Sequence, residues 1–370
     1  MNIQQLYTKA LNFEFLTLQE GVFLYQNSVL PELMWVANEM RKKIQEKNGH
    51  KNVVGWIIDR NVNYANACVS HCKFCNFYRT PASSECYITS MEEYRKKIEE
   101  MLLLGGNQLL LQGGLHPKLK IDFYENLFSQ LKKEYPNVKL HALGPPEIHH
   151  IARISKLTYT QTLQQLIAAG LDSLPGAGAE ILSDRVRKIL SPGKCLTEQW
   201  LSVMREAHKM QITASATMMY GHIETLEERI NHLILLRELQ AEKAENSNGF
   251  TTFVAWPFQD DKTELKDNLK VTNKTSAEDY IRVIATSRIM MPNILNIQAS
   301  WLTVGKDIAQ LCLHSGANDF GSIMIEENVV SAAGANHKFN ATEIQQAIKE
   351  AGFTPRLRNQ KYEYSEENIF

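Results

Sequence analysis

The stretch VVGWIIDRNVNYANACVSHCKFCNFYRT, residues 53–80, joins a β-rich run to three closely spaced cysteines. Cys68, Cys72 and Cys75 form the pattern C-x3-C-x2-C, and no fourth cysteine continues it. A 4Fe–4S cluster that is bound by protein alone takes four thiolates. Three thiolates would leave one iron open for a substrate or a cofactor. Because the cysteines directly follow a predicted strand, we expect a loop wrapped around a cluster, with Phe74 as apolar cover.

Other uses of these cysteines are a zinc site and a disulfide. A zinc site would need His71 or Cys86 as its fourth ligand, but zinc sites usually pair two knuckles and no second knuckle is present. The chain has six cysteines in 370 residues and no secretory apolar segment at its start, which favours a reducing compartment. Cys312, in IAQLCLHSG, is interpreted as a core residue.

Composition excludes several classes of function. Charge is balanced, with 40 basic and 41 acidic residues, so nothing indicates nucleic acid as a partner. No apolar run approaches the roughly 20 residues of a membrane span. We therefore expect a soluble cytoplasmic protein without a membrane or nucleic-acid partner.

Eight strand candidates alternate with helical patterns after residue 50 and predict a parallel α/β sheet. They are residues 53–64, 107–114, 138–144, 171–178, 212–221, 250–259, 296–301 and 318–322. Eight strands close a (β/α)8 TIM-type barrel, and an open doubly wound sheet is the alternative. We predict an N-terminal helical extension (1–50), the barrel (51–335), and a C-terminal helix and tail packed on it (336–370).

Polar and glycine-rich motifs follow several of these strands, where a barrel places its chemistry. Gln112-Gly113-Gly114 follows the second strand and lets a ligand approach the backbone, although an ordinary turn has the same composition. Glu180, in GAGAE after the fourth strand, suits a pair of ribose hydroxyls. Candidate catalytic groups, which can equally be ordinary hydrogen-bonding residues, are Tyr220, His222 and Asp319. Trp256 and Trp301 can face an aromatic substrate or pack in the core.

The cysteine string resembles the signature of the radical S-adenosylmethionine (SAM) enzymes, in which the open iron binds the methionine end of SAM. Over residues 50 to 355 the sequence resembles the cyclic dehypoxanthine futalosine synthase family of menaquinone biosynthesis. The narrower resemblance rests on PPEIHHIARISK (145–156) and GAGAEILSDRVRKILSPGKC (176–195). It implies that Gly113 and Gly114 meet the methionine amino group, and that Glu180 binds the SAM ribose. It also implies that the strand before Gly221 passes beside adenine. In the family this strand carries the pattern G-x-I-x-G-x-x-E; here Thr217 stands in the first glycine position and Met219 in the isoleucine position, which leaves the roles of their side chains open.

The resemblance implies a reaction and its partners. A 5′-deoxyadenosyl radical would take the hydrogen from the ribose 4′ carbon of dehypoxanthine futalosine, and the carbon radical would add to the substrate's benzoate ring. An external donor such as a flavodoxin or ferredoxin would supply one electron. Alternatives are aminofutalosine synthase, an FO synthase-like enzyme and a non-catalytic iron–sulfur electron carrier. Candidate partners for the substrate carboxylate are Arg79, Arg153, Arg185 and Arg187.

Overall fold

The computed structural model describes residues 1–326, 328, 331–334 and 337–365. Ten parallel strands of these residues form one sheet, in the order β10-β1-β9-β8-β7-β6-β5-β4-β3-β2. The strands are β1 (Val53–Ile57), β2 (Asp59–Asn63), β3 (Gln108–Gln112), β4 (Lys139–Ala142), β5 (Ser173–Leu174), β6 (Thr213–Tyr220), β7 (Phe250–Pro257), β8 (Asn296–Ala299), β9 (Asp319–Ser322) and β10 (Thr354–Leu357).

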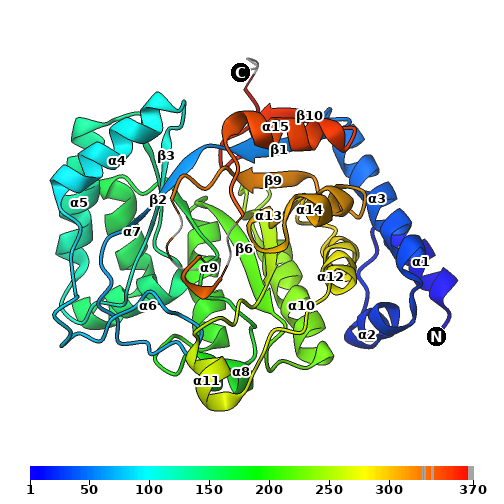
Figure 1. Ribbon diagram of the computed structural model, residues 1–370, viewed down its shortest axis with the longest axis horizontal. Coiled ribbons are helices and arrows are strands. Elements are labelled where there is room, and N and C mark those ends of the chain that lie inside the picture. Colours follow the sequence, from blue (N-terminus) through cyan, green and yellow to red (C-terminus); the bar gives the residue numbers. More distant parts are fainter. Residues whose placement is uncertain (327, 329–330, 335–336, 366–370) are drawn as a thin grey trace.

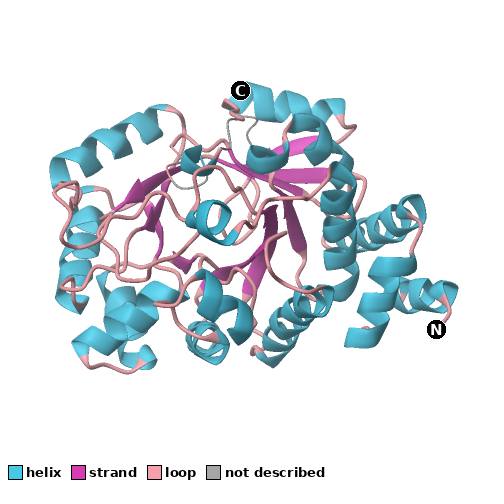
Figure 2. Ribbon diagram, turned by 60° about the horizontal axis from the view of Figure 1, so that its bottom comes forward, coloured by secondary structure: helices cyan, strands magenta, loops and turns pink. Residues whose placement is uncertain are grey.

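The sheet closes on itself through its first strand, which is interrupted at Ile58. Its first half, β1, pairs with β9, and its second half, β2, pairs with β3. Figure 2 shows the sheet curled around central loops and short helices, with the longer helices outside it. Each of the eight predicted strand segments contains a strand, and 53–64 contains both β1 and β2. The predicted TIM-type barrel is therefore confirmed, and the open doubly wound alternative is excluded.

Helices connect the strands, and most of them cover the outside of the barrel, whereas the short helix α13 (Trp301–Val304) borders its interior (Figure 1). They are α4 (Met91–Leu103), α5 (Ile121–Glu134), α6 (Pro145–Ser155), α7 (Tyr159–Ala169), α8 (Asp184–Leu190), α9 (Thr197–Lys209), α10 (Leu226–Glu242), α11 (Glu264–Leu269), α12 (Ala277–Met290), α13 (Trp301–Val304) and α14 (Lys306–Leu313). Capping boxes begin α4, α10 and α12 at Ser90, Thr225 and Ser276, each followed three residues later in the sequence by Glu or Asp.

Three helices precede the barrel and pack on its side. They are α1 (Ile3–Leu11), α2 (Leu18–Asn27) and α3 (Leu30–Lys47), and in Figure 1 they lie beside α12. Buried Arg237 of α10 donates to the carbonyl of Leu16 at 2.9 Å, and Arg282 of α12 donates to the carbonyl of Ser28 at 2.8 Å. These bonds tie the N-terminal segment to the outer layer of the barrel.

The chain ends with the 3-10 turn η1 (Ser331–Ala333), α15 (Ala341–Glu350) and β10. The sequence analysis did not predict β10, which pairs with β1 from Val53↔Thr354 to Trp56↔Leu357. Beyond β10, the backbone N–H of Arg358 donates to the carbonyl of Trp56 at 2.9 Å. The tail thereby continues along the first strand of the barrel.

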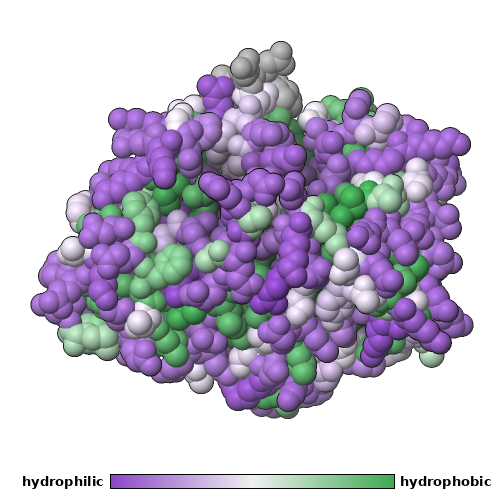
Figure 3. All heavy atoms as spheres, turned by 180° about the vertical axis from the view of Figure 1, so that it is seen from behind, coloured by the Kyte–Doolittle hydropathy of each residue, from purple (hydrophilic) through white to green (hydrophobic). Residues whose placement is uncertain are grey.

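The outer surface is predominantly polar. On the face shown in Figure 3, polar residues cover most of the area and apolar residues form scattered spots. None of the helices within the described residues is both long and apolar enough to span a membrane.

Candidate active site

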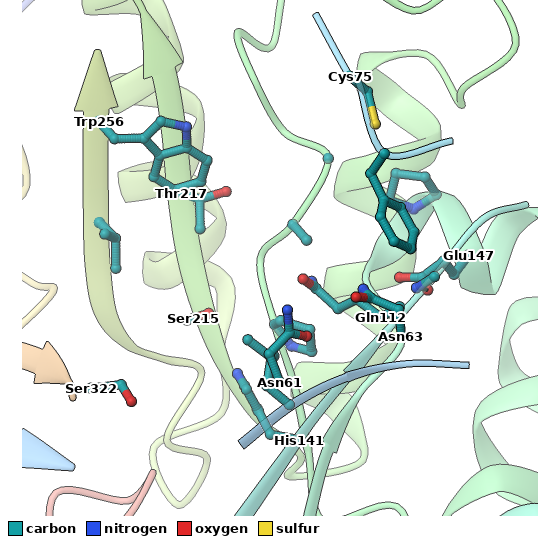
Figure 4. Close-up of a pocket in the computed structure, with 18 of the residues that line it drawn as sticks. Asn61, Asn63, Cys75, Gln112, His141, Glu147, Ser215, Thr217, Trp256 and Ser322 are labelled. Atoms are coloured by element: carbon teal, nitrogen blue, oxygen red, sulfur yellow. Dashed lines mark hydrogen bonds between the residues drawn. The ribbon is translucent and has the colours of Figure 1, made fainter. Parts of the chain in front are cut away.

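A cavity of about 400 Å³ lies inside the barrel and is called the main cavity below. Residues of the cysteine loop line it, as do residues from the strand ends and from the C-terminal tail. In the close-up of Figure 4, Cys75 lies at the top and His141 at the bottom, while Trp256 lies on the opposite wall from Glu147. One continuous cavity therefore connects the cysteines with the interior of the barrel.

The three predicted cluster ligands, Cys68, Cys72 and Cys75, all line the main cavity. The hydroxyl of Ser70 lies 2.9 Å from the sulfur of Cys68 and 3.2 Å from that of Cys72. The backbone N–H of Leu115 donates to the sulfur of Cys68 at 3.2 Å. Thiols that share one cavity and accept such hydrogen bonds fit an iron–sulfur cluster, because N–H and O–H donors around the sulfurs tune its potential.

Burial favours the neutral, protonated form of these thiols. It raises the pKa of Cys72 to about 12, although the nearby Lys194 opposes the shift, and it also raises the pKa of Cys75. Ligation by a metal removes the thiol proton, so these cysteines are suited to permanent ligation rather than to free-thiolate chemistry. Among the described residues, no group of three or more His, Cys, Asp and Glu side chains could hold a single metal ion.

The predicted glycine pair lies beside the backbone that leads into the cysteine loop. A side-chain carbon on Gly114 would come within 2.2 Å of the carbonyl oxygen of Ala67, so only glycine fits there. The N–H of Gly113 donates at 3.0 Å to Glu147, a buried carboxyl that the sequence analysis did not select. Gln112, Gly113 and Gly114 all line the main cavity.

The Glu147 carboxyl accepts hydrogen bonds from residues that follow three different strands, β2, β3 and β4. Besides the N–H of Gly113, it accepts from the hydroxyl of Tyr64 at 2.9 Å and from the N–H of Gly144 at 2.6 Å. Burial raises the pKa of Glu147 to about 7, against the opposing effect of these hydrogen bonds. A carboxyl with a pKa near neutrality inside a cavity is a candidate proton acceptor.

Glu180 lies in the main cavity with an unusual backbone, at φ 41°. Its Oε1 accepts from the ammonium of Lys194 at 2.8 Å, and that ammonium lies 5.3 Å from the centre of the Phe74 ring. Burial would lower the pKa of Lys194, but Cys72 and Glu180 outweigh it and raise the pKa. The buried Oε2 of Glu180 has no hydrogen-bond partner, which fits an acceptor for a ligand hydroxyl.

The deeper wall of the main cavity is polar. Alternate residues of β2 and β6 face it, namely Asp59, Asn61 and Asn63, and Ser215 and Thr217. His141 of β4 lies at its lower end and hydrogen-bonds the Ser173 hydroxyl at 2.7 Å (Figure 4). Burial lowers the pKa of His141 to about 3, with Arg358 adding to the effect, so this imidazole is neutral near pH 7. Branched apolar side chains usually fill the interior of such barrels, so this polar wall differs from the common pattern.

Trp256 and Trp301 both line the main cavity, as the substrate interpretation requires. The four arginines that the sequence offered for a carboxylate are not among its lining residues. Arg187, for instance, is buried and donates to the carbonyls of Ala179 and Cys195. The arginine that lines the cavity is Arg358, from the C-terminal tail.

The predicted catalytic residues Tyr220 and His222 lie away from the cysteines. With Gly221 they line a second cavity of about 430 Å³, at the C-terminal end of β6. Side chains alternate along a strand, so Tyr220 faces the helices while Ser215 and Thr217 face the main cavity. His222 is bonded to the carbonyl of Met219 at 3.0 Å.

Asp319, the third predicted catalytic residue, is fully buried behind Arg358. Its two oxygens accept from Nε of Arg358 at 2.5 Å and from Nη2 at 2.7 Å. It is not among the residues that line the main cavity. The structure therefore gives Asp319 an arginine as its partner.

Comparisons with known proteins match these observations. The model of the radical SAM superfamily matches residues 62–236, and that of the CofH/MqnC C-terminal region matches 247–369. A relative from Halalkalibacterium halodurans, named cyclic dehypoxanthine futalosine synthase, is 40% identical over 98% of this chain and 95% of its own. A relative of the same name from Streptomyces coelicolor is 40% identical over 94% and 85%.

Other relatives carry a different name. One from Archaeoglobus fulgidus, a 5-amino-6-(D-ribitylamino)uracil–L-tyrosine 4-hydroxyphenyl transferase, is 36% identical over 90% of this chain and 93% of its own. Among solved structures, methylornithine synthase (PylB) is similar with a TM-score of 0.71 at 18% identity, covering 96% of this chain and 98% of its own. HydG, a maturase of the FeFe-hydrogenase, has a TM-score of 0.74 at 16% identity, covering 96% and 76%. The chain belongs to the radical SAM superfamily and is a radical SAM enzyme, a family that implies a 4Fe–4S cluster and SAM.

Proposed function

We propose that this enzyme is a cyclase that converts dehypoxanthine futalosine to cyclic dehypoxanthine futalosine in menaquinone biosynthesis. The observation that carries the proposal is the main cavity, which joins three cysteines to a polar wall and to two tryptophans. Relatives with this name extend over nearly the whole chain at 40% identity, which supports the same assignment.

Within this proposal, the cysteine loop and its neighbours hold the cofactors. The cluster ligands are Cys68, Cys72 and Cys75. Glu180 accepts a hydroxyl of the SAM ribose through its unpartnered oxygen, while Gly113 and Gly114 leave room for the methionine end and Phe74 covers it. When bound, cluster and SAM supply the radical that removes a hydrogen atom from the substrate.

The chain itself positions the substrate and excludes water. Cyclisation requires the sugar carbon and the aromatic ring to be held in a near-attack pose. Trp256 and Trp301 offer aromatic surface for the ring, and the polar side chains of β2 and β6 offer hydrogen bonds to the sugar. For the last proton, Glu147 is better placed than Tyr220 or His222, because it lines the main cavity and its pKa is about 7.

A transferase acting on L-tyrosine is the second candidate, because relatives with that name are 36% to 38% identical to this chain. A cyclase needs one substrate, whereas a transferase joins two. Under either function an external one-electron donor, such as a flavodoxin or ferredoxin, would be needed.

The test is an anaerobic incubation of reconstituted enzyme with SAM, dithionite and dehypoxanthine futalosine, followed by mass spectrometry. We expect 5′-deoxyadenosine together with a product that is two hydrogen atoms lighter than the substrate. A parallel incubation contains L-tyrosine and 5-amino-6-(D-ribitylamino)uracil. Formation of 5′-deoxyadenosine and coupled product only in that second incubation would refute the cyclase and support the transferase.

A further inference from the structure

Of the residues that the structure describes, two with cationic side chains line the main cavity, and they come from different parts of the chain. Lys194 lies among the cysteines and is paired with Glu180. Arg358 comes from the tail after β10, which runs beside β1. His141 also lines the cavity, but its pKa of about 3 leaves it neutral near pH 7. Of these two, Arg358 is thus the cationic side chain that lies away from the proposed SAM site.

The Arg358 guanidinium is held from three directions. Nε and Nη2 donate to Asp319, and Nη1 donates to the carbonyl of Asn359 at 3.3 Å. The ring of Tyr362 lies against one face, 4.2 Å from Cζ. Gly55 makes room for this arrangement, because a side-chain carbon there would lie 2.4 Å from an oxygen of Asp319. The guanidinium is therefore fixed in orientation before any ligand arrives.

These hydrogen bonds do not use all the N–H donors of the Arg358 guanidinium. Arginine has five N–H donors, and the bonds to Asp319 and Asn359 use three of them. Asp319 binds along the edge formed by Nε and Nη2, so one N–H on Nη1 and one on Nη2 remain for a second acceptor. A guanidinium can meet a carboxylate there through two parallel bonds.

A second acid near Arg358 is Asp59, which accepts from the hydroxyl of Ser322 at 2.5 Å. Burial raises the pKa of Asp59 and outweighs the opposing effects of Ser322 and Arg358, which favours the neutral form of Asp59 and reduces its competition for the guanidinium. A carboxylate brought into such a buried place needs a hydrogen-bonded cation, because an unpaired buried charge is strongly unfavourable.

We propose that Arg358 is the specificity-determining residue that binds the carboxylate of the substrate in the main cavity. This inference rests on the proposed function, whose substrate carries a benzoate. Asp319 is then a positioning residue that orients the guanidinium. L-tyrosine, the substrate in the name of the transferases, also carries a carboxylate, so Arg358 selects for charge and not between the two reactions.

The test compares dehypoxanthine futalosine with its carboxamide, which has the same shape without the charge. Arg358→Gln alone would leave the buried Asp319 carboxylate without a cation, with the N–H of Gly321 still donating to it at 2.8 Å, so the informative variant is Asp319→Asn/Arg358→Gln, which removes both charges. Asp319→Asn is its matched control, because it keeps the guanidinium and retains one side-chain oxygen that can accept from it and hold its orientation. Iron content and the melting temperature of each variant show whether it has folded and loaded its cluster.

We expect wild type to prefer the acid over the amide on the order of 100-fold in kcat/KM. Asp319→Asn keeps this preference, whatever its overall rate, and the double variant loses it through a higher KM for the acid. Equal loss of preference in Asp319→Asn, or a retained preference in the double variant, would overturn the role of Arg358. If wild type converts neither compound, the proposed function itself is refuted.

Discussion

Replacing Glu180 with glutamine tests the SAM pocket at one atom. Oε1 accepts from Lys194 at 2.8 Å, whereas Oε2 is buried, lies 3.6 Å from Nη1 of Arg187 and has no hydrogen-bond partner. Glutamine keeps the shape and one oxygen, but it replaces the other with a donor. A hydrogen bond to a charged group contributes about 1.5 to 3 kcal/mol. We therefore expect the Kd for SAM to rise roughly 10- to 100-fold.

Isothermal titration of SAM into anaerobically reconstituted protein measures this change, and iron analysis confirms that the cluster is intact. Glu198→Gln is the matched control, because Glu198 is 76% exposed on α9, where it pairs with Arg205 at 3.4 Å and accepts from Ser202 at 3.2 Å. An exposed ion pair contributes little, so the control should stay within about threefold of wild type. A Glu180→Gln protein with full iron content and a Kd as close to wild type as the control would refute the assignment.

Three further predictions concern the cluster and Glu147. Alanine at Cys68, Cys72 or Cys75 should abolish iron loading in anaerobic reconstitution, while Cys86→Ser should keep it; loss of iron in Cys86→Ser would indicate a fourth protein ligand. Ser70→Ala should lower the reduction potential of the cluster, because it removes a hydroxyl 2.9 Å from the sulfur of Cys68; an EPR redox titration with an unchanged potential would contradict this. Glu147 has a folded pKa of about 7 against an ordinary 4.5, so its stabilising effect is present below pH 4.5 and is lost as pH rises through 7. That loss corresponds to roughly 3 kcal/mol, and urea unfolding of Glu147→Gln should lack this slope; the same slope in the variant would assign it to other groups.

Local signals predicted the barrel because they are strong in this chain. Ser90, Thr225 and Ser276 each begin a helix with a capping box, and Gly170 ends α7 in a left-handed conformation. These signals depend on hydrogen bonds between residues a few positions apart, so they can be recognised in the local sequence. The position of the cysteine loop after β2 could be predicted as well, because a parallel barrel places its functional loops at the ends of its strands.

The contacts of Arg358, Glu147 and Lys194 could not be predicted in this way. Arg358 meets Asp319 across 39 residues of sequence, and Glu147 meets Gly113 across 34. Such pairs arise only when the sheet closes and the tail adds β10, and neither register nor closure is visible in local periodicity. The tail itself reads TPRLRNQ, which has too few apolar residues to indicate a strand.

Strand alternation was an available signal that the sequence analysis did not use. Polar residues at 59, 61 and 63, and at 215 and 217, repeat with the two-residue period of a strand. That period indicates one polar face inside the barrel, where the main cavity lies. It also puts Tyr220 on the opposite face from Thr217, in agreement with its position in the second cavity.

The most direct measurement of the proposed reaction follows one hydrogen atom. Dehypoxanthine futalosine with deuterium at the ribose 4′ carbon is incubated with reduced enzyme and SAM, and 5′-deoxyadenosine is analysed by mass spectrometry. We expect the deuterium to appear in 5′-deoxyadenosine and to be absent from a product two hydrogen atoms lighter than unlabelled substrate. Unlabelled 5′-deoxyadenosine alongside substrate that keeps its deuterium would contradict the proposed cyclisation.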